Sequence, residues 1–408
     1  MVSVEQALEI VLRETPALPA EEVPLEDALG RVLAHDVVAD RDLPPFARAA
    51  MDGYALRAAD VQQAPAALEV VGEVRAGEWP TLVVETGQAA RIMTGAPLPQ
   101  GATAIQQVEK TRPLDEFRVT ITAAVAEGQN IAPRGCEVRS GDVVLAKGRV
   151  VDPAAIGVLA TAGCASVGVS CRPLVAVLVT GDEIVEVAAT PGPSQIRNSN
   201  GPAVAAQARL AGADVRLLGV APDRQQAIAE ALRAGLAADV LLVSGGVSAG
   251  EYDLVEPALI ELGATLLFTR VAVKPGAPLV FGRLGKALVF GLPGNPVSAQ
   301  VCCDLFVRAA LLKLQGASVL SRPRVGVELA ASVRNRSGRK SHTPASVRYE
   351  DGRLLARPLR SAGSGDLVAH ARANALVVLE AEREEAAQGE TVEALLLGRF
   401  LEDDGAAP

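Results

Sequence analysis

The sequence predicts a multidomain α/β protein built around a doubly wound, mostly parallel sheet, with β-rich parts before and after it. Its 408 residues suffice for about two to four domains, each with its own core. Apolar residues make up 49% and aromatic residues 3% of the chain, a composition typical of a globular protein. Between residues 172 and 320, fully apolar strands alternate with helices, which indicates a parallel sheet covered on both faces.

The central sheet is predicted from its apolar strands and the helices between them. Asp223 with Gln226 has the spacing of a helix start, and Asn295 followed by Pro296 is a typical helix opening. In such a sheet, ligands bind in the loops beyond the carboxyl ends of the strands. The strands are expected at residues 174–179, 215–218, 240–243, 266–271 and 288–290, and the helices at residues 202–210, 223–236 and 295–314.

The chain before this sheet shows two patterns. Ser3 and Gln6 have the capping-box spacing in front of an amphipathic helix, and the apolar positions of residues 25–33 predict a second helix. From residue 42 to about residue 141 the pattern changes to short β-rich runs broken by Gly and Pro. This middle part is therefore predicted to be a β-rich domain inserted into a discontinuous first domain.

Short strands return after the central sheet, and their spacing predicts a small β-barrel or sandwich. They are expected at residues 324–329, 346–349, 354–358, 375–379 and 391–396. The whole chain is thus expected to have four parts. Their boundaries are residues 1–41 with 142–171 for the discontinuous first domain, 42–141 for the inserted domain, 172–320 for the doubly wound domain and 321–402 for the C-terminal domain.

The charge balance and the rare residue types argue against several classes of protein. Lys and Arg number 39 against 48 Asp and Glu, and the formal charge of −9 disfavours non-specific binding to nucleic acid. The basic run of Arg334, Arg336, Arg339 and Lys340 is more typical of a solvated loop. Five cysteines without CxxC spacing and three scattered histidines argue against a disulfide framework, a zinc knuckle and a histidine metal site.

Neither a membrane span nor a signal for export is predicted. The longest uncharged stretch, residues 154–171, contains three glycines and several hydroxyl side chains, and it is interpreted as a buried, close-packed segment. The N-terminus lacks the basic and then apolar order of a signal peptide. A protein of the reducing cytoplasm is therefore expected.

Two loops at the expected ligand-binding edge suit an anionic ligand. Ser244, Gly245 and Gly246 follow a strand and lead on to Ser248, and the main-chain N–H groups of such a loop can cradle a phosphate or another oxyanion. A complete GxGxxG or Walker A sequence is absent, so ordinary dinucleotide or P-loop binding loses support. Residues 291–296 are expected to form a rigid turn into a helix. A purely structural role is the better interpretation of this turn, although it can also orient main-chain donors towards a ligand.

Carboxyl groups surround this glycine loop. Glu183 ends the first strand of the sheet, and Asp253 follows the glycine loop closely. Acids clustered at one sheet edge repel each other, and a hard cation such as Mg²⁺ would compensate them and neutralise a phosphate. Lys274 could supply a fixed positive charge for the same anion. Taken singly, Asp182, Glu183 and Asp253 are better explained as loop acids or helix caps, and Asp223 has an explicit capping position.

Two more polar residues lie in turns of the predicted inserted domain. Asp52 lies within the segment AAMDGYA, and Thr94 lies within RIMTGAP. An Asp-Gly pair alone signals a turn, so spacing identifies neither residue as catalytic.

Six segments together resemble the molybdopterin molybdenumtransferase family, which includes MoeA and the gephyrin E domain. They occur in the family's order and span nearly the whole chain, which makes the resemblance specific although each fragment alone is weak. The segments are AAMDGYA (49–55), RIMTGAPLP (91–99), VTGDEI (179–184), SGGVSAGEYD (244–253), VAVKPGAP (271–278) and GLPGNPVSA (291–299).

The resemblance implies a fold and an activity. The expected subunit has a discontinuous first domain, an inserted β-rich second domain, a doubly wound MogA-like third domain and a β-barrel fourth domain. The expected homodimer forms its cleft between the third domain of one subunit and the second domain of the other. The family inserts molybdenum from molybdate into adenylylated molybdopterin and releases AMP, with Mg²⁺ as the expected metal. Implied partners are the adenylyltransferase and apo-molybdoenzymes, but no nucleic acid and no membrane.

The resemblance also implies a set of site residues on this chain, with Asp52 and Thr94 reaching the cleft from the second domain. The expected catalytic residues are Glu183, Asp52, Asp253 and Lys274, of which Asp52, Glu183 and Asp253 are also the expected metal ligands. The expected substrate-binding residues are Thr94, Asp223, Ser244, Gly245, Gly246, Ser248, Pro293, Ser364 and Arg339. The substrate's own dithiolene sulfurs would ligate molybdenum, so no protein cysteine is needed.

Two positions depart from the family pattern. Ala277 stands where many relatives carry a second lysine, so one anion contact is missing or comes from elsewhere. Glu137 stands where relatives can carry aspartate, and the longer acid can shift a metal or substrate contact. Three alternatives stay open: the preceding adenylylation step, a non-catalytic scaffold, and tungstate as the oxyanion.

Overall fold

The computed structural model describes residues 1–246, 254–360 and 363–398. The chain divides into two compact units. One comprises Met1–His35, Lys147–Asp152 and Ser166–Pro408, and the other comprises Asp36–Ala146 and Pro153–Ala165. The second unit is thus inserted into a discontinuous first one, which also contains the central sheet and the C-terminal strands. The finer division into four domains stays a prediction.

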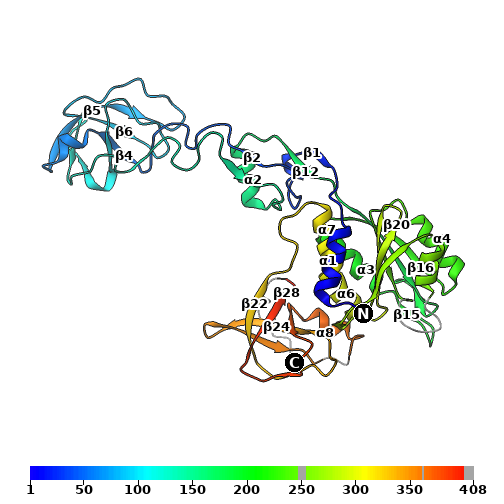
Figure 1. Cartoon of the computed structure of the whole chain (residues 1–408). Coiled ribbons are helices and arrows are strands. Elements are labelled where there is room, and N and C mark those ends of the chain that lie inside the picture. The colour runs from blue at the N-terminus through cyan, green and yellow to red at the C-terminus, as the bar shows by residue number, and fades with distance from the viewer. Residues whose placement is uncertain (247–253, 361–362, 399–408) are drawn as a thin grey trace. The chain divides into compact units, whose positions relative to one another are not determined.

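A six-stranded sheet forms the centre of the first unit (Figure 1). The strands β16, β13, β17 and β21 pair in parallel, while β20 pairs antiparallel with both β21 and β18. Strand β20 was not predicted, because the Pro and Gly residues before it indicate a loop. In spatial order the strands are β16 (Asp214–Ala221), β13 (Leu174–Thr180), β17 (Val240–Ser244), β21 (Ala287–Leu292), β20 (Pro278–Leu284) and β18 (Thr265–Arg270).

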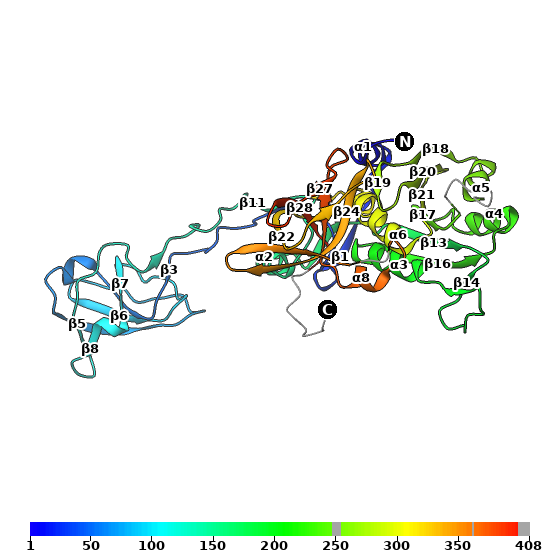
Figure 2. The same ribbon diagram turned by 90° about the horizontal axis from the view of Figure 1, so that it is seen from below.

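Alternate residues of the central strands face two separate cores, which confirms the doubly wound prediction. In β13, Val175 and Val177 belong to one core, whereas Ala176 and Leu178 belong to the other. Two helices cover the second core, and Figure 2 shows them together beside the sheet: α4 (Gln225–Ala234) and α5 (Val255–Glu261). The first core is covered by α1 (Val4–Glu14), α3 (Asn200–Leu210), α6 (Pro296–Cys302), η4 (Cys303–Val307) and α7 (Arg308–Leu314).

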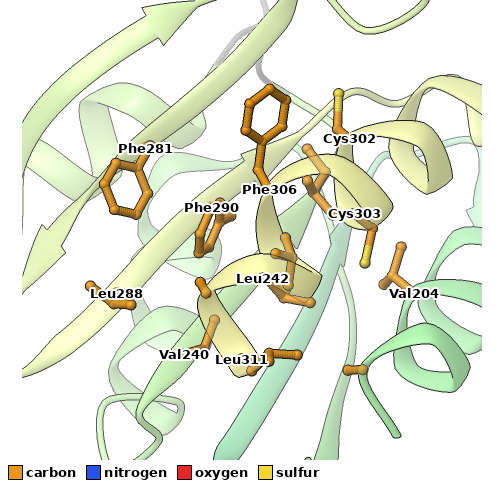
Figure 3. Packing of buried hydrophobic residues seen from close by; sticks show 14 of the residues in the cluster. Val204, Val240, Leu242, Phe281, Leu288, Phe290, Cys302, Cys303, Phe306 and Leu311 are labelled. Carbon is orange, nitrogen blue, oxygen red and sulfur yellow. The ribbon is translucent and has the colours of Figure 1, made fainter. Parts of the chain in front are cut away.

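Phenylalanine rings fill the middle of the first core (Figure 3). Phe281, Phe290 and Phe306 are fully buried, and the ring centroids of Phe281 and Phe290 lie 4.8 Å apart. Cys302 and Cys303 lie in the same core, where burial raises the pKa of the Cys302 thiol to about 12. These two thiols therefore act as small apolar groups, since a reactive cysteine needs an accessible thiolate.

Two of these helices begin where the sequence predicts. Ser3 and Gln6 form the predicted capping box at the start of α1. Asn295 occupies the predicted N-cap position of α6 and is followed by Pro296, although its side chain makes no capping hydrogen bond. The predicted cap of α4 is wrong. This helix begins after Arg224, and its N-cap makes no side-chain hydrogen bond. Asp223 therefore lies in the loop between β16 and this helix.

The C-terminal part of the first unit is a closed five-stranded barrel, which decides between the two predicted alternatives. Its last strand in spatial order, β26, pairs back onto β24 and so closes the barrel. In spatial order the strands are β24 (Lys340–Glu350), β25 (Arg353–Pro358), β22 (Arg324–Leu329), β28 (Thr391–Leu396) and β26 (Ala375–Leu379).

The basic run of the barrel is not simply a solvated loop. The side chain of Lys340 is only 13% exposed, and its Nζ lies 2.8 Å from Glu5 Oε1 and 2.7 Å from Glu380 Oε1. Lys340 therefore ties the N-terminal helix α1 to the barrel. The prediction of a solvated loop is therefore wrong for Lys340, because ion pairs between distant segments are not visible in the local sequence.

The second unit contains a six-stranded sheet. β5 and β6 pair in parallel, and the other neighbouring strands pair antiparallel. Alternate residues again face two cores, with Ala55 and Ile92 on one side and Leu56 and Ala89 on the other. In spatial order the strands are β7 (Ala104–Gln107), β4 (Gly53–Leu56), β6 (Gln88–Ile92), β5 (Ala66–Val74), β9 (Arg118–Ile121) and β8 (Thr111–Pro113).

Two predictions for the first domain are wrong. Residues 25–33 form a single 3₁₀ turn at Leu25–Asp27 instead of a helix, because Gly30 adopts a positive φ of 75° and the chain then forms β-bridges. Residues 154–171 are largely exposed or half-buried. They form most of helix α2 (Pro153–Thr161) and strand β12 (Ser166–Ser170), not one buried segment.

Candidate functional site

A cavity of about 630 Å³ opens at the carboxyl ends of β13, β17 and β21. This is the edge at which ligands bind in doubly wound sheets. The cavity brings together six of the residues predicted for the site: Glu183, Asp223, Ser244, Gly245, Gly246 and Pro293. Its walls also include Gly294 and Pro296 of the predicted turn, and four residues for which no role was predicted: Thr180, Arg197, Asn198 and Asn200.

Glu183 is placed by a short ribbon beside the sheet. It follows β13 and leads into β14 (Ile184–Val185), which pairs in parallel with β15 (Ile196–Arg197). The main-chain N–H of Ile196 donates to the carbonyl oxygen of Glu183 at 2.8 Å. This bond and the two flanking strands, β13 and β14, hold the main chain at Glu183. The exposed Glu183 side chain therefore starts from a fixed position at the cavity wall.

Asp223 is the second carboxyl group of the cavity. It follows β16, and its main-chain N–H donates to Asp182 Oδ1 at 3.1 Å. Asp182 thus acts as a loop acid that supports its neighbour, which was one of the two alternatives for it. The two carboxyl groups at the wall, those of Glu183 and Asp223, come from adjacent strands of the sheet.

The glycine loop needs glycine for steric reasons. Gly245 has a φ of 102°, and a Cβ atom there would lie 2.5 Å from the carbonyl oxygen of Thr180. Gly246 has a φ of 61°, which side chains also disfavour. The N–H of Gly245 donates to Leu292 O at 3.2 Å, so this loop stays attached to the neighbouring strand.

Two side chains in the cavity wall, Thr180 and Asn200, are buried and differ in their hydrogen bonds. Thr180 is 4% exposed, and within the described residues its hydroxyl has no hydrogen-bond partner. Asn200 is 9% exposed, and its Nδ2 donates to Ser244 Oγ and to Gly294 O, both at 2.8 Å. Asn200 escaped sequence reasoning because an asparagine at a helix start is ordinarily read as a capping residue.

Three other predicted residues lie outside the cavity lining. Lys274 is exposed on β19 (Val273–Lys274), which pairs with the barrel strand β24. Arg339 precedes that strand, and its Nη1 donates to Val273 O at 3.4 Å, so Arg339 lies beside the Lys274 segment. Ser364 accepts a hydrogen bond at its main-chain oxygen from Val297 N at 3.0 Å, and its neighbour Gly365 does line the cavity.

In the second unit, Asp52 and Thr94 form a hydrogen-bonded pair. Thr94 donates from both its main-chain N–H and its hydroxyl to Asp52 Oδ1, each at 2.6 Å. These two bonds favour the charged form and hold the pKa of the Asp52 carboxyl below its usual range. Both residues are exposed. Spacing along the chain could not reveal this pair, because the two turns meet only in the folded unit, where β4 pairs with β6 and Ala49 N–H donates to Ala96 O.

Two of the predicted site residues lie outside the described part of the chain. Ser248 and Asp253 fall in the range 247–253, which the structure does not describe. Across the described residues, no three His, Cys, Asp or Glu side chains gather as a metal site. The described helices include none that is both long and apolar enough to span a bilayer.

Three family models match successive parts of the chain. The MoeA N-terminal region (domain I and II) matches residues 2–163, a probable molybdopterin binding domain matches residues 176–313, and the MoeA C-terminal region (domain IV) matches residues 326–397. Together these matches extend over nearly the whole chain.

Full-length relatives and solved structures are similar to this chain. The molybdopterin molybdenumtransferase of Bacillus subtilis strain 168 is 34% identical, with 97% of this chain and 94% of that protein covered. The corresponding protein of Staphylococcus aureus strain COL is 32% identical, with 97% and 95% covered. The crystal structure of a molybdopterin biosynthesis moeA protein from Pyrococcus horikoshii OT3 is 33% identical, covers 97% of this chain and 100% of that one, and gives a TM-score of 0.83.

Proposed function

The chain belongs to the molybdopterin molybdenumtransferase family, and from this we propose that it inserts molybdenum from molybdate into adenylylated molybdopterin and releases AMP. One observation carries the proposal. A single cavity at the carboxyl ends of β13, β17 and β21 combines a glycine loop with the carboxyl groups of Glu183 and Asp223. A phosphate ester accompanied by a hard cation needs both kinds of group.

The glycine loop would bind the anionic part of the substrate. Because Gly245 and Gly246 have no side chains, a phosphate oxygen can approach the main chain closely at the carboxyl end of β17. Prepositioned main-chain donors of this kind stabilise charge without reorganising during the reaction. Lys274, Arg339 and Ser364 are proposed to bind molybdate or phosphate beside the barrel, where Arg339 already contacts the Lys274 segment.

We propose Mg²⁺ as the metal of this cavity, a proposal that the oxygen donors in its wall support. Glu183 and Asp223 offer oxygen ligands, and Mg²⁺ in proteins is usually bound by one or two carboxylates together with substrate phosphates and water. Bound there, Mg²⁺ would supply positive charge that polarises a phosphate oxygen. Asp52 and Asp253 are the further proposed ligands.

The chain's own acids would orient the substrate rather than transfer a proton to it. Thr94 places both of its hydrogen bonds on Oδ1 of Asp52 and keeps this carboxyl ionised, so Oδ2 faces no competing donor from Thr94. A carboxylate fixed in this way can accept hydrogen bonds from the substrate or bind a cation without first losing a proton. Glu183 and Asp223 are proposed to do the same from the cavity wall.

We also propose a homodimer with a shared cleft, working in the cytoplasm. In this arrangement the inserted unit of each subunit would complete the cavity of the other, with Asp52 and Thr94 facing it. The exposure of both residues in the single chain supports this proposal.

The direct test is turnover of defined substrates. Purified protein incubated with adenylylated molybdopterin, molybdate and Mg²⁺ is expected to release AMP and to yield a cofactor that activates an apo-molybdoenzyme. Intact nucleotide after incubation with correctly folded protein would contradict the proposal. Consumption of ATP with free molybdopterin would instead indicate the adenylylation step, and inactivity towards both would indicate a scaffold. Competition between molybdate and tungstate in the same assay identifies the preferred oxyanion.

The shared cleft has its own test in mixed dimers. Dimers that pair an Asp52→Ala subunit with a Glu183→Gln subunit are expected to have about one working cleft in two. Both substitutions then fall in one cleft, and the other cleft keeps wild-type Asp52 and Glu183. Dimers that carry either substitution in both subunits supply the control and should be inactive. A mixed dimer no more active than these controls would contradict a shared site.

A further inference from the structure

Asn200 links three segments that meet at the cavity. It is the first residue of α3, it is 9% exposed, and its Nδ2 donates to Ser244 Oγ and to Gly294 O at 2.8 Å each. Ser244 is 1% exposed and extends this hydrogen-bond network, because its hydroxyl donates to Pro293 O at 3.3 Å. One buried side chain therefore connects a helix start, the end of β17 and the turn after β21.

The two partners of Asn200 fix the chemistry that this position needs. Gly294 O is a main-chain carbonyl and can only accept, so the NH₂ group of the amide must face it. The same NH₂ group has a second N–H, and Ser244 Oγ accepts it. An aspartate of the same shape has no donor when ionised, and an alanine has none at all.

The linked segments are the ones that would hold the substrate. Ser244 leads directly into the glycine loop, and the N–H of Gly245 donates to Leu292 O, two residues before Gly294. The spacing between the glycine loop and the turn after β21 therefore depends on Asn200 together with two direct bonds between these segments. These bonds run from Gly245 N–H to Leu292 O at 3.2 Å and from the Ser244 hydroxyl to Pro293 O at 3.3 Å.

We propose that Asn200 is a positioning residue of this site, which holds the glycine loop and the Pro293–Gly294 turn at the spacing that the substrate phosphates require. The inference rests on the proposed function and adds to it a residue outside the predicted set. Asn200 acts through Ser244 and Gly294 rather than through the reacting atoms.

Replacement by aspartate gives a readout that simple loss of stability would not produce. Asn200→Asp keeps the shape, but the ionised carboxylate repels Gly294 O, and burial beside a carbonyl raises the pKa of such a carboxyl. Protonation restores one donor. The activity of Asn200→Asp relative to wild type is therefore expected to rise as the pH falls from 8.5 to 6, by up to about tenfold per pH unit above the carboxyl pKa. Asn200→Ala is expected to lose about 10- to 100-fold in kcat/KM at every pH.

Asn374 supplies the matched control. It is 4% exposed in the barrel, and its side chain also makes two buried hydrogen bonds, both with the main chain of Val347. Asn374→Asp introduces the same buried acid away from the cavity. Its activity relative to wild type is expected to stay independent of pH, so a pH-dependent ratio confined to Asn200→Asp supports the proposal.

A second measurement does not depend on turnover. Hydrogen–deuterium exchange of the peptides covering residues 241–246 and 291–296 is expected to be faster in Asn200→Ala than in wild type and unchanged in Asn374→Asp. Unchanged exchange in Asn200→Ala would overturn the positioning role whatever the enzyme assay shows. An active wild type with a flat Asn200→Asp ratio would also overturn it, whereas an inactive wild type with faster exchange would contradict only the proposed function.

Discussion

Acid should destabilise the barrel through a single buried histidine. His342 lies on β24 opposite Val378 of β26, and it is 2% exposed. Burial, assisted by the positive charges of Lys340 and Arg324, lowers the pKa of its imidazole from 6.5 to about 3. In the described part of the chain its Nδ1 has no hydrogen-bond partner, so a proton gained there would be a buried and unsatisfied charge.

The sign and the size of the effect follow from the two pKa values. Between pH 6.5 and about 3 the unfolded chain binds a proton at His342 and the folded barrel does not, so stability falls as the pH falls. The slope is about 1.4 kcal/mol per pH unit. From pH 7.5 to pH 5 this one group should therefore remove about 2 kcal/mol from the free energy of unfolding of the barrel.

The perturbation is His342→Leu, with His342→Gln as a polar replacement that does not titrate either. Pulse labelling by hydrogen exchange across a urea series, read on peptides from β24 and β26, reports the unfolding of the barrel separately from the rest of the chain. Both variants should lose about 2 kcal/mol less than wild type between pH 7.5 and pH 5. Effects of other groups cancel in this comparison. Variants that lose as much stability as wild type would refute the reasoning.

Three further predictions concern the site and the N-terminal helix. Gly245→Ala is expected to cost about 1–3 kcal/mol in a thermal or urea melt, because the new Cβ would lie 2.5 Å from Thr180 O; an unchanged melt would contradict the close approach. Lys340 lowers the pKa of Glu5 to about 2, so the stability advantage of wild type over Glu5→Gln in urea should exist above pH 4.5 and vanish towards pH 2; a constant gap would exclude this pairing. Glu183→Gln should keep the wild-type melt but lose about 100-fold or more in AMP release, and full activity would remove Glu183 from the site.

Local sequence was sufficient where a single strand or turn determines its own structure. The apolar runs of β13, β17 and β21 predicted a sheet buried on both faces, and all three are fully or almost fully buried. The glycine loop after β17 and the capping box of α1 were predicted for the same reason, since each needs only a few neighbouring residues.

Pairing between distant segments explains what the sequence could not show. Residues 25–33 have helical spacing, but bridges from Val32 and Leu33 to segments more than a hundred residues away replace the helix. The Asp52–Thr94 pair and the Asn200 network are likewise made by side chains far apart in the chain. In each case local propensity was overruled by tertiary contacts.

The interrupted first unit has a consequence for how the protein is made. Helix α1 packs in the same core as α7, and β1 (Ala20–Pro24) pairs with β12, so the earliest residues have their partners far along the chain. During translation β1 must wait until the inserted unit has been made, and α1 must wait until most of the central sheet has also been made. The inserted unit, whose own strands are close in sequence, should therefore fold before the unit that surrounds it in the chain.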